Sequence, residues 1–266
     1  MMLKDYLRKA QKQGFAIGQF NFSTIEQLRG ILAAAHGMKS PVILGTSEGE
    51  SKFLGLEEIL ALVEISKMKY NVSAFLNLDH GKDLDYIKKA IDFGYSAVHF
   101  DGSDLPLEKN IRYAKKVVEY AHKKGVLVEG ELDSIKKQSS TSLKEAEKFI
   151  KETKVDSLAI AIGNVHGMHK NPKLDFERLK EINNRVNSFL VLHGGSGIPN
   201  VQIRKAIKFG IVKININTEL RLAWKRTLAK SLKAQEIKPY KILPKVQKAV
   251  QEKVEEKIKL FNRVKI

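Results

Sequence analysis

Three histidines in this sequence follow short apolar segments, each with the length of a buried strand. They are His80, His166 and His193. The chain contains no cysteine, so a bound transition metal would need histidine or carboxylate ligands. Three imidazoles that converge at one place suit a catalytic Zn²⁺, which uses three protein ligands and keeps one position open. A lone histidine would more often be structural, but three at matched positions predict a metal site.

A carboxylate precedes the first of these histidines. Asp79 and His80 are consecutive, and consecutive strand residues project in different directions. One side chain would reach a metal while the other meets the substrate, where an aspartate suits general acid or base catalysis. Asp79 also fits two other roles, the cap of a helix and the hydrogen-bond partner of a ligating histidine. The residues alone leave these roles open.

Two polar segments nearer the C-terminus favour anion binding. The first is Gly194–Gly197, of sequence GGSG, and the second runs from Asn215 to Glu219. Backbone N–H groups of glycines and the N-terminus of a following helix attract a phosphate group. In barrels of alternating strands and helices, the loops after the seventh and eighth strands commonly hold a phosphate.

The elements that must position these residues follow from a repeating pattern. Short β-branched or apolar segments predict strands at Ala16–Phe22, Pro41–Ser47, Val72–His80, Ala97–Asp101, Val126–Glu131, Ser157–Gly163, Phe189–Gly194 and Val212–Thr218. Apolar residues three and four apart predict helices at Ile25–Met38, Gly55–Lys69, Leu84–Phe93, Leu107–Lys124, Ser142–Thr153, Asp175–Asn184 and Asn200–Phe209. This repeated order, with no linker, predicts an α/β fold, a single (β/α)8 TIM barrel, rather than an open sheet.

Nearly every predicted strand ends in polar residues or glycine. Buried parallel strands should be apolar throughout, yet the strand endings include Asn21, Ser47, Asp101, Glu131 and Gly163–Gly167. The C-terminal ends of barrel strands meet at one face, and that face carries the active site. We therefore expect these residues to surround the site.

The chain is strongly basic, with 47 Lys and Arg against 30 Asp and Glu and a formal net charge of +17. More than half of the excess lies in residues 221–266, where lysines alternate with Val246, Val250, Val254 and Ile258. This spacing predicts an amphipathic helix with a solvated basic face. We assign residues 1–225 to the barrel and residues 226–266 to a basic helical extension packed on it. Nucleic-acid or membrane-surface binding is the other interpretation of the charge, although neither is the expected partner.

Composition narrows the class of protein further. Hydrophobic residues make up 43% of the chain, which suffices for a sizeable buried core. No apolar run approaches the roughly 20 residues of a membrane span, and Met1–Lys12 lacks the apolar core of a signal peptide. We expect a soluble protein of the cytoplasm.

The motifs resemble those of class II, metal-dependent fructose/tagatose-bisphosphate aldolases. Residues 78–81 are similar to the family's LDHG motif and residues 90–103 to its AI..GF.SVMIDGS motif. Residues 128–132, 159–167, 192–199 and 213–221 are similar to VE.ELG, AVAIG..HG, LHGGSGIP and K.N..TELR. The resemblance runs in order through about residues 1–225.

This resemblance implies a reaction and a site. It implies reversible cleavage of fructose 1,6-bisphosphate to dihydroxyacetone phosphate and glyceraldehyde 3-phosphate, in a homodimer or homotetramer. Asp79 would be the acid or base, and one Zn²⁺ would lie on His80, His166 and His193. Asp101 and Glu131 match positions that hold an accessory metal or monovalent cation in relatives. The dihydroxyacetone-phosphate moiety would lie among Gly167, Gly194, Ser196, Asn215, Asn217, Thr218 and, from another strand, Ser47.

One segment departs from the family pattern. Relatives have a glycine-rich acidic loop after Glu131-Leu132, whereas residues 133–141 here lack glycine and are basic after Asp133. Asp133 or Glu145 could supply the missing base, or the substrate could differ. Asp104 and His169 also depart from the family's usual residues. Tagatose 1,6-bisphosphate, another acceptor aldehyde, and an inactive barrel that binds nucleic acid remain alternatives.

Overall fold

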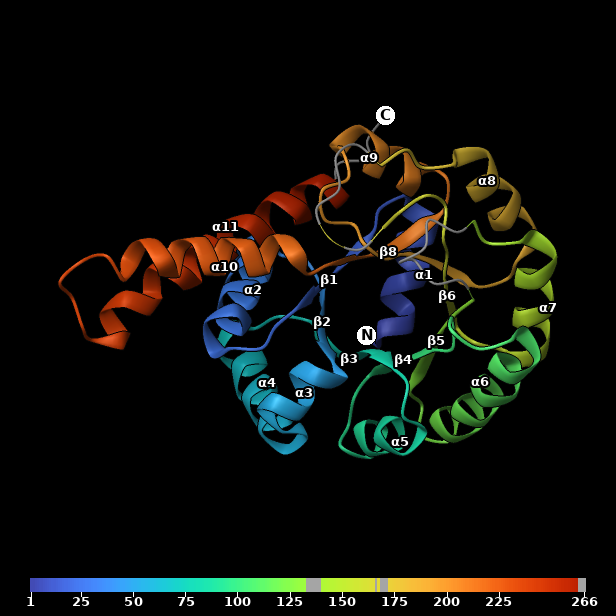
Figure 1. Ribbon diagram of the computed structural model, residues 1–266, viewed down its shortest axis with the longest axis horizontal. Helices are drawn as coiled ribbons and strands as arrows, with labels where there is room; N and C mark the ends of the chain where they lie inside the picture. The colour runs from blue at the N-terminus through green and yellow to red at the C-terminus, as the bar shows by residue number, and fades with distance from the viewer. Residues whose placement is uncertain (133–139, 166, 168–171, 263–266) are drawn as a thin grey trace.

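A computed structural model describes residues 1–132, 140–165, 167 and 172–262, and the predicted (β/α)8 barrel is confirmed. Eight parallel strands pair in chain order, and β8 closes the barrel on β1, with helices around the outside (Figure 1). The strands are β1 (Ile17–Asn21), β2 (Val42–Ser47), β3 (Ala74–Gly81), β4 (Ala97–Asp101), β5 (Leu127–Glu131), β6 (Ser157–Ala159), β7 (Phe189–Leu192) and β8 (Ile211–Ile216).

The register of the strands brings their polar C-terminal ends to one level. The strands are buried along almost their whole length, because helices cover their outer faces and side chains fill the barrel. Ser47 of β2 lies beside Asp79 of β3, and Asp101 of β4 lies beside Glu131 of β5. The polar residues predicted at strand ends therefore face one barrel mouth.

Three strands end at least two residues earlier than predicted. β6 ends at Ala159 instead of Gly163, and β7 ends before Gly194. Both glycines have positive φ, +92° and +61°, which lies outside the range of strands. β8 ends at Ile216, because Thr218 already begins the next helix.

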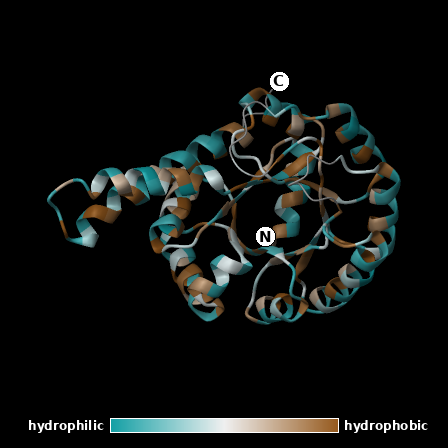
Figure 2. Ribbon diagram, viewed as in Figure 1, coloured by the Kyte–Doolittle hydropathy of each residue, from teal (hydrophilic) through white to brown (hydrophobic). Residues whose placement is uncertain are grey.

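The helices predicted between strands are all present. They are α2 (Ile25–Gly37), α4 (Leu56–Tyr70), α5 (Leu84–Asp92), α6 (Leu107–His122), α7 (Leu143–Thr153), α8 (Phe176–Arg185) and α9 (Asn200–Lys208). Hydrophilic residues line much of their outer rim (Figure 2). None of the described helices is long and apolar enough to cross a membrane.

Two further helices were not predicted. In α1 (Leu3–Gln13), the side chains of Leu3 and Leu7 are buried against Ile17 and Ile43, near the starts of the strands. This helix therefore closes the N-terminal end of the barrel, where it is visible through the ring of strands (Figure 1). The short helix α3 (Glu48–Leu54) starts at the end of β2, where Ser47 caps it by accepting a hydrogen bond from the Glu50 amide.

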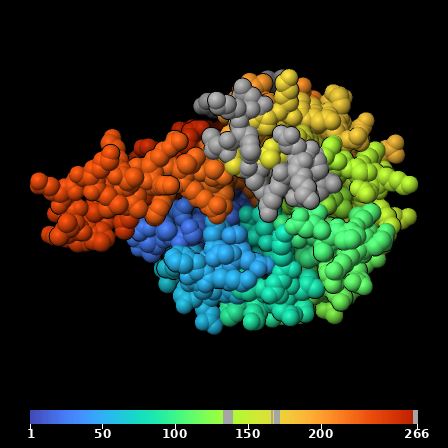
Figure 3. Space-filling model, viewed as in Figure 1, coloured from blue at the N-terminus to red at the C-terminus, as the bar shows by residue number. Residues whose placement is uncertain are grey.

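The C-terminal part of the chain forms two long helices, α10 (Thr218–Ser231) and α11 (Pro239–Asn262). The predicted apolar spacing of Val246, Val250, Val254 and Ile258 is a buried stripe of α11. α11 packs along α2, where a Cβ on Gly30 would come within 2.8 Å of the carbonyl oxygen of residue 247. The connection between α10 and α11 projects beyond the barrel as an arm (Figure 3).

Candidate active site

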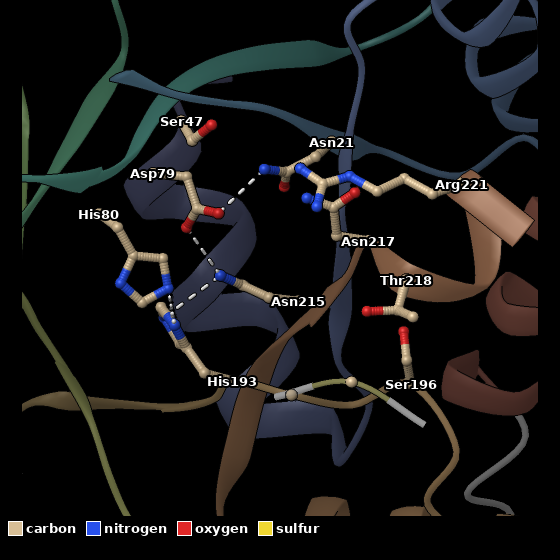
Figure 4. A pocket seen from close by; sticks show the side chains of 12 residues that line it. Asn21, Ser47, Asp79, His80, His193, Ser196, Asn215, Asn217, Thr218 and Arg221 are labelled. Carbon is tan, nitrogen blue, oxygen red and sulfur yellow. Dashed lines mark hydrogen bonds between the residues drawn. The ribbon is translucent and has the colours of Figure 1, made fainter. Parts of the chain in front are cut away.

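A cavity of about 230 Å³ opens at the C-terminal mouth of the barrel (Figure 4). It brings together ten of the predicted site residues: Ser47, Asp79, His80, Gly167, His193, Gly194, Ser196, Asn215, Asn217 and Thr218. Asn21 and Arg221 also line it. Asp101 and Glu131 lie next to His80. The predicted ligand His166, with Asp133 and His169, lies outside the described residues.

An irregularity in β3 places Asp79 and His80 in the same cavity. In a regular strand, consecutive side chains point to opposite faces. Here the register between β3 and β4 shifts between Leu78 and Gly81, and His80 has a φ of +51°. This local break, a β-bulge, turns both side chains towards the barrel interior. The sequence pattern did not predict the bulge.

The imidazoles of His80 and His193 are prepared for a metal ion. His80 donates from Nδ1 to Asp101 Oδ2 at 3.0 Å, and His193 donates from Nε2 to Glu129 Oε1 at 2.6 Å. The remaining nitrogens, His80 Nε2 and His193 Nδ1, lie 3.1 Å apart. Ligand atoms around a tetrahedral Zn²⁺ are separated by about 3.3 Å. A carboxylate behind each ligating imidazole is also the usual arrangement in metal sites, so these two residues fit the metal.

The charges around the two rings give them different proton affinities. Burial lowers the pKa of His80, but the charge of Asp79 and the hydrogen bond to Asp101 raise it more, to about 9. Burial also lowers the pKa of His193, and its bond to Glu129 does not restore the usual value. Without a metal, His80 therefore carries a proton on Nε2, and this proton lies between His80 Nε2 and His193 Nδ1.

Asp79 is held as an ionised carboxylate. Its Oδ2 accepts a hydrogen bond from Asn21 at 2.9 Å, and its Oδ1 accepts one from Asn215 at 3.1 Å. Burial raises the pKa of Asp79, but the electrostatic effect of the neighbouring imidazoles, first His80 and then His193, outweighs burial and keeps the pKa below its usual range. Asp79 is thus a fixed, charged carboxylate at the cavity wall.

A buried ion pair supports the metal-facing ring of His193. Glu129 accepts from His193 through Oε1 and from Lys213 Nζ through Oε2, each at 2.6 Å. Burial raises the pKa of Glu129, yet Lys213 and His193 lower it well below the usual value. Neither Glu129 nor Lys213 was predicted as a site residue, although both belong to the quoted motifs. Their inward position at alternating strand residues is the signal that could have identified them.

A second carboxylate pair lies beside His80. Asp101 Oδ1 accepts from the Ser103 hydroxyl at 2.6 Å, and Glu131 Oε2 lies 3.7 Å from His80 Nδ1. Burial raises the pKa of Asp101, but the hydrogen bond from His80 and the nearby imidazoles lower it by more, so the pKa lies below its usual value. Glu131 Oε2 is buried and hydrogen-bonds none of the described residues. His80, Asp101 and Glu131 form a group with the geometry to hold a cation.

The opposite side of the cavity has the character of an anion site. Asn217 and Thr218 lie at the N-terminus of α10, where backbone N–H groups favour negative charge. Ser196 approaches the same turn, since its hydroxyl accepts from the Glu219 amide at 3.3 Å. Arg221 adds a guanidinium group, which Glu50 holds at 2.6 Å. Sequence reasoning missed Arg221, although it stands at the end of a quoted motif.

Asp104, which departs from the family pattern, and Glu145, a candidate for the missing base, both lie away from the cavity. Asp104 forms an exposed ion pair with Lys82 at 2.6 Å. Glu145 is exposed in the first turn of α7 and does not line the cavity.

The fold and site define a (β/α)8-barrel protein. Its cavity combines a cluster of histidines and carboxylates, of the kind that binds metal ions, with a pocket suited to an anion. The chain belongs to the class-II fructose-bisphosphate aldolase family, whose model matches residues 1–265. A fructose-bisphosphate aldolase of Staphylococcus aureus is 39% identical over 281 residues, covering 99% of this chain and 98% of that protein. Such aldolases are lyases, and the family is generally metal-dependent.

Other relatives carry different names. A 6-phospho-5-dehydro-2-deoxy-D-gluconate aldolase of Shouchella clausii is 40% identical over 269 residues, covering 96% of this chain and 92% of that protein. Among solved structures, the YdjI aldolase of Escherichia coli K12 is similar with a TM-score of 0.89 and 34% identity, covering 100% of this chain and 98% of that one. The family is therefore shared by aldolases of more than one named substrate.

Proposed function

We propose that this protein is a zinc-dependent aldolase that reversibly cleaves fructose 1,6-bisphosphate to dihydroxyacetone phosphate and glyceraldehyde 3-phosphate. One observation carries the proposal: the ionised carboxylate of Asp79 and the paired nitrogens of His80 and His193 face the same cavity. A base beside a metal-type centre is what a retro-aldol reaction requires.

Binding begins at the anion side of the cavity. We assign the phosphate of the dihydroxyacetone half to Ser196, Asn217 and Thr218, with backbone N–H groups of Gly167 and Gly194. The N-terminus of α10 favours that charge. Arg221 supplies a fixed cation there, since Glu50 prevents its side chain from turning away. Ser47, on the far side of Asp79, would meet the sugar chain.

Asp79 then accepts the proton of the C4 hydroxyl. The C3–C4 bond breaks as the C4 oxygen becomes the aldehyde carbonyl, and the electron pair moves towards the C2 ketone oxygen, which leaves the enediolate of dihydroxyacetone phosphate. A proton taken up from water at C3 then completes this product. Zn²⁺ held by His80, His193 and, by resemblance, His166 would supply a Lewis acid that stabilises negative charge at that oxygen. Asn21 and Asn215 keep the Asp79 carboxylate aimed at the cavity through both its oxygens. In the reverse direction Asp79 returns the proton.

The decisive experiment measures cleavage of fructose 1,6-bisphosphate with a coupled assay for dihydroxyacetone phosphate, with Zn²⁺ or with a chelator. We expect chelation to abolish activity and Asp79→Asn to lower kcat by about 10²- to 10⁴-fold. The matched control is Asp85→Asn, because Asp85 is exposed and pairs only with Lys88 in the described contacts. Full activity of Asp79→Asn would refute the assigned base.

One comparison supports a second class of substrate, the sugar-acid phosphates. The relative from Shouchella clausii is named for a sugar-acid phosphate, and the donor half of the cavity would be unchanged for any ketose that releases a phosphorylated three-carbon fragment. Fructose 1,6-bisphosphate, tagatose 1,6-bisphosphate and 6-phospho-5-dehydro-2-deoxygluconate should be compared by kcat/KM. Binding of RNA that is lost at high salt but survives chelation would instead support the inactive-barrel alternative.

The proposed substrate also suggests where and in what form the protein acts. Phosphorylated sugars are charged and do not cross membranes unaided, so we place the reaction in the cytoplasm, in glycolysis and gluconeogenesis. We propose a homodimer or homotetramer, in line with the resemblance. Light scattering after gel filtration measures the assembly directly.

A further inference from the structure

A fourth histidine lies beneath the site and is absent from the predicted ligand set. His99 stands in β4, two residues before Asp101, so both side chains face the barrel interior. It is fully buried. Its ring centroid lies 4.7 Å from that of His80 and 4.8 Å from that of His193. The family motif quoted above has methionine at this position.

The hydrogen bonds of His99 decide between two roles. Its Nδ1 accepts a hydrogen bond from the backbone N–H of His80 at 3.1 Å. The proton of the ring must therefore lie on Nε2, which faces Glu131 Oε2 at 3.3 Å. A metal at Nδ1 would need the lone pair that already accepts the His80 N–H. A metal at Nε2 would require the ring to lose its proton. His99 thus belongs to the cluster by position, but its hydrogen bonding does not suit a metal ligand.

The amide that donates to His99 is the His80 N–H, which the bulge displaces from the β3–β4 ladder. The register shift between Leu78 and Gly81 takes the His80 amide out of the ladder between β3 and β4. His80 also has the left-handed φ that non-glycine residues rarely adopt. A buried amide without a partner would disfavour this conformation. The ring of His99 replaces the lost ladder bond.

We propose that His99 is a positioning residue that maintains the bulge at Asp79 and His80, and so directs the base and a metal-ligating imidazole into one cavity. The inference rests on the proposed metal-dependent cleavage. Its second nitrogen faces the accessory carboxylate, because His99 Nε2 lies 3.3 Å from Glu131 Oε2, and neither atom has a hydrogen-bond partner among the described residues.

Two substitutions of His99 distinguish the effect of its hydrogen-bond acceptor, Nδ1, from the effects of its size and polarity. In His99→Asn, the side-chain oxygen takes the place of Nδ1 and can still accept from the His80 amide. His99→Gln is also polar and closer in size to histidine, but it has carbon at the δ position and places its amide near Nε2. His36→Gln is the control, because His36 is exposed on α2. The readouts are the Zn²⁺ dissociation constant from chelator competition, kcat at saturating Zn²⁺, and hydrogen exchange of the His80 amide.

We expect His99→Gln to weaken Zn²⁺ binding by about 10- to 100-fold, as substitutions behind metal ligands do, to lower kcat at saturating Zn²⁺, and to speed exchange of the His80 amide. His99→Asn should stay close to the wild type in all three. Equal weakening by both substitutions, or wild-type behaviour of His99→Gln, would overturn the proposal. A wild-type protein that binds no Zn²⁺ would instead refute the proposed function, so the two failures are distinguishable.

Discussion

The raised pKa of His80 predicts that protons compete strongly with the metal. The pKa is about 9, so at pH 7 the ring must release a proton before Nε2 can bind a metal ion. Each pH unit below the pKa weakens apparent binding about tenfold, or about 1.4 kcal/mol. Between pH 7 and pH 9, the apparent dissociation constant for Zn²⁺ should therefore fall about 50-fold, or by about 2.3 kcal/mol, because the ring is almost fully protonated at pH 7 and half protonated at pH 9.

The assay is competition with a chromophoric chelator whose own protonation is corrected at each pH. Calorimetry in buffers of different ionisation enthalpy counts the protons directly. About one proton should be released from His80 per metal ion at pH 7, falling to about half of one at pH 9. His193 should contribute none, because its pKa is already lowered.

Asp101→Asn tests the physical cause. It removes the carboxylate that accepts from His80 Nδ1 at 3.0 Å, so the pKa of His80 should fall and the affinity should level off at a lower pH. An affinity independent of pH between 7 and 9 in the wild type, with no proton release, would refute the reasoning.

The same pKa predicts the opposite trend for the stability of the metal-free protein. A group whose pKa is raised by folding stabilises the folded state fully below its unfolded value, here 6.5, and loses that effect as the pH rises through about 9. The melting temperature of the metal-free protein should therefore fall over this window. In the metal-loaded protein, tighter metal binding should offset the fall.

Three further predictions concern other contacts. Lys213→Met should lower the free energy of unfolding by about 3–5 kcal/mol, because it leaves the buried carboxylate of Glu129 without its cation; chemical denaturation measures this, and a loss below 1 kcal/mol would contradict it. Arg221→Gln should raise KM for fructose 1,6-bisphosphate about tenfold or more by removing a charged bond to phosphate, while an unchanged KM would remove Arg221 from the assigned site. Gly30→Ala should destabilise the protein by about 1–3 kcal/mol, since the new Cβ would overlap the α11 backbone; unchanged thermal unfolding would show that α2 and α11 separate easily.

The periodicity of the sequence was sufficient to predict the barrel. Apolar segments alternating with helical spacing indicate strands and helices locally, and the helices between strands were found with their ends displaced by only a few residues. The predicted strand Ser157–Gly163 is too long, since β6 ends at Ala159 and Gly163 has a left-handed backbone that composition does not reveal. α1 was missed because its three buried residues, Leu3, Leu7 and Ala10, become buried only when the helix packs against the N-terminal end of the barrel.

Ten predicted site residues meet in one cavity because strand ends must converge in a closed parallel barrel, so their positions follow from the pattern alone. The partners of those residues do not follow from it. Glu129 with Lys213, and Glu50 with Arg221, join segments far apart in the chain, and only the closed barrel sets their distances.

The clearest division lies at Asp79 and His80. The sequence by itself determined that a carboxylate and an imidazole stand side by side at the end of a strand. Regular strand geometry would have turned them to opposite faces. Only the tertiary structure decided that both enter the cavity, because the shift between β3 and β4 frees the His80 amide and the buried ring of His99 on the neighbouring strand accepts it.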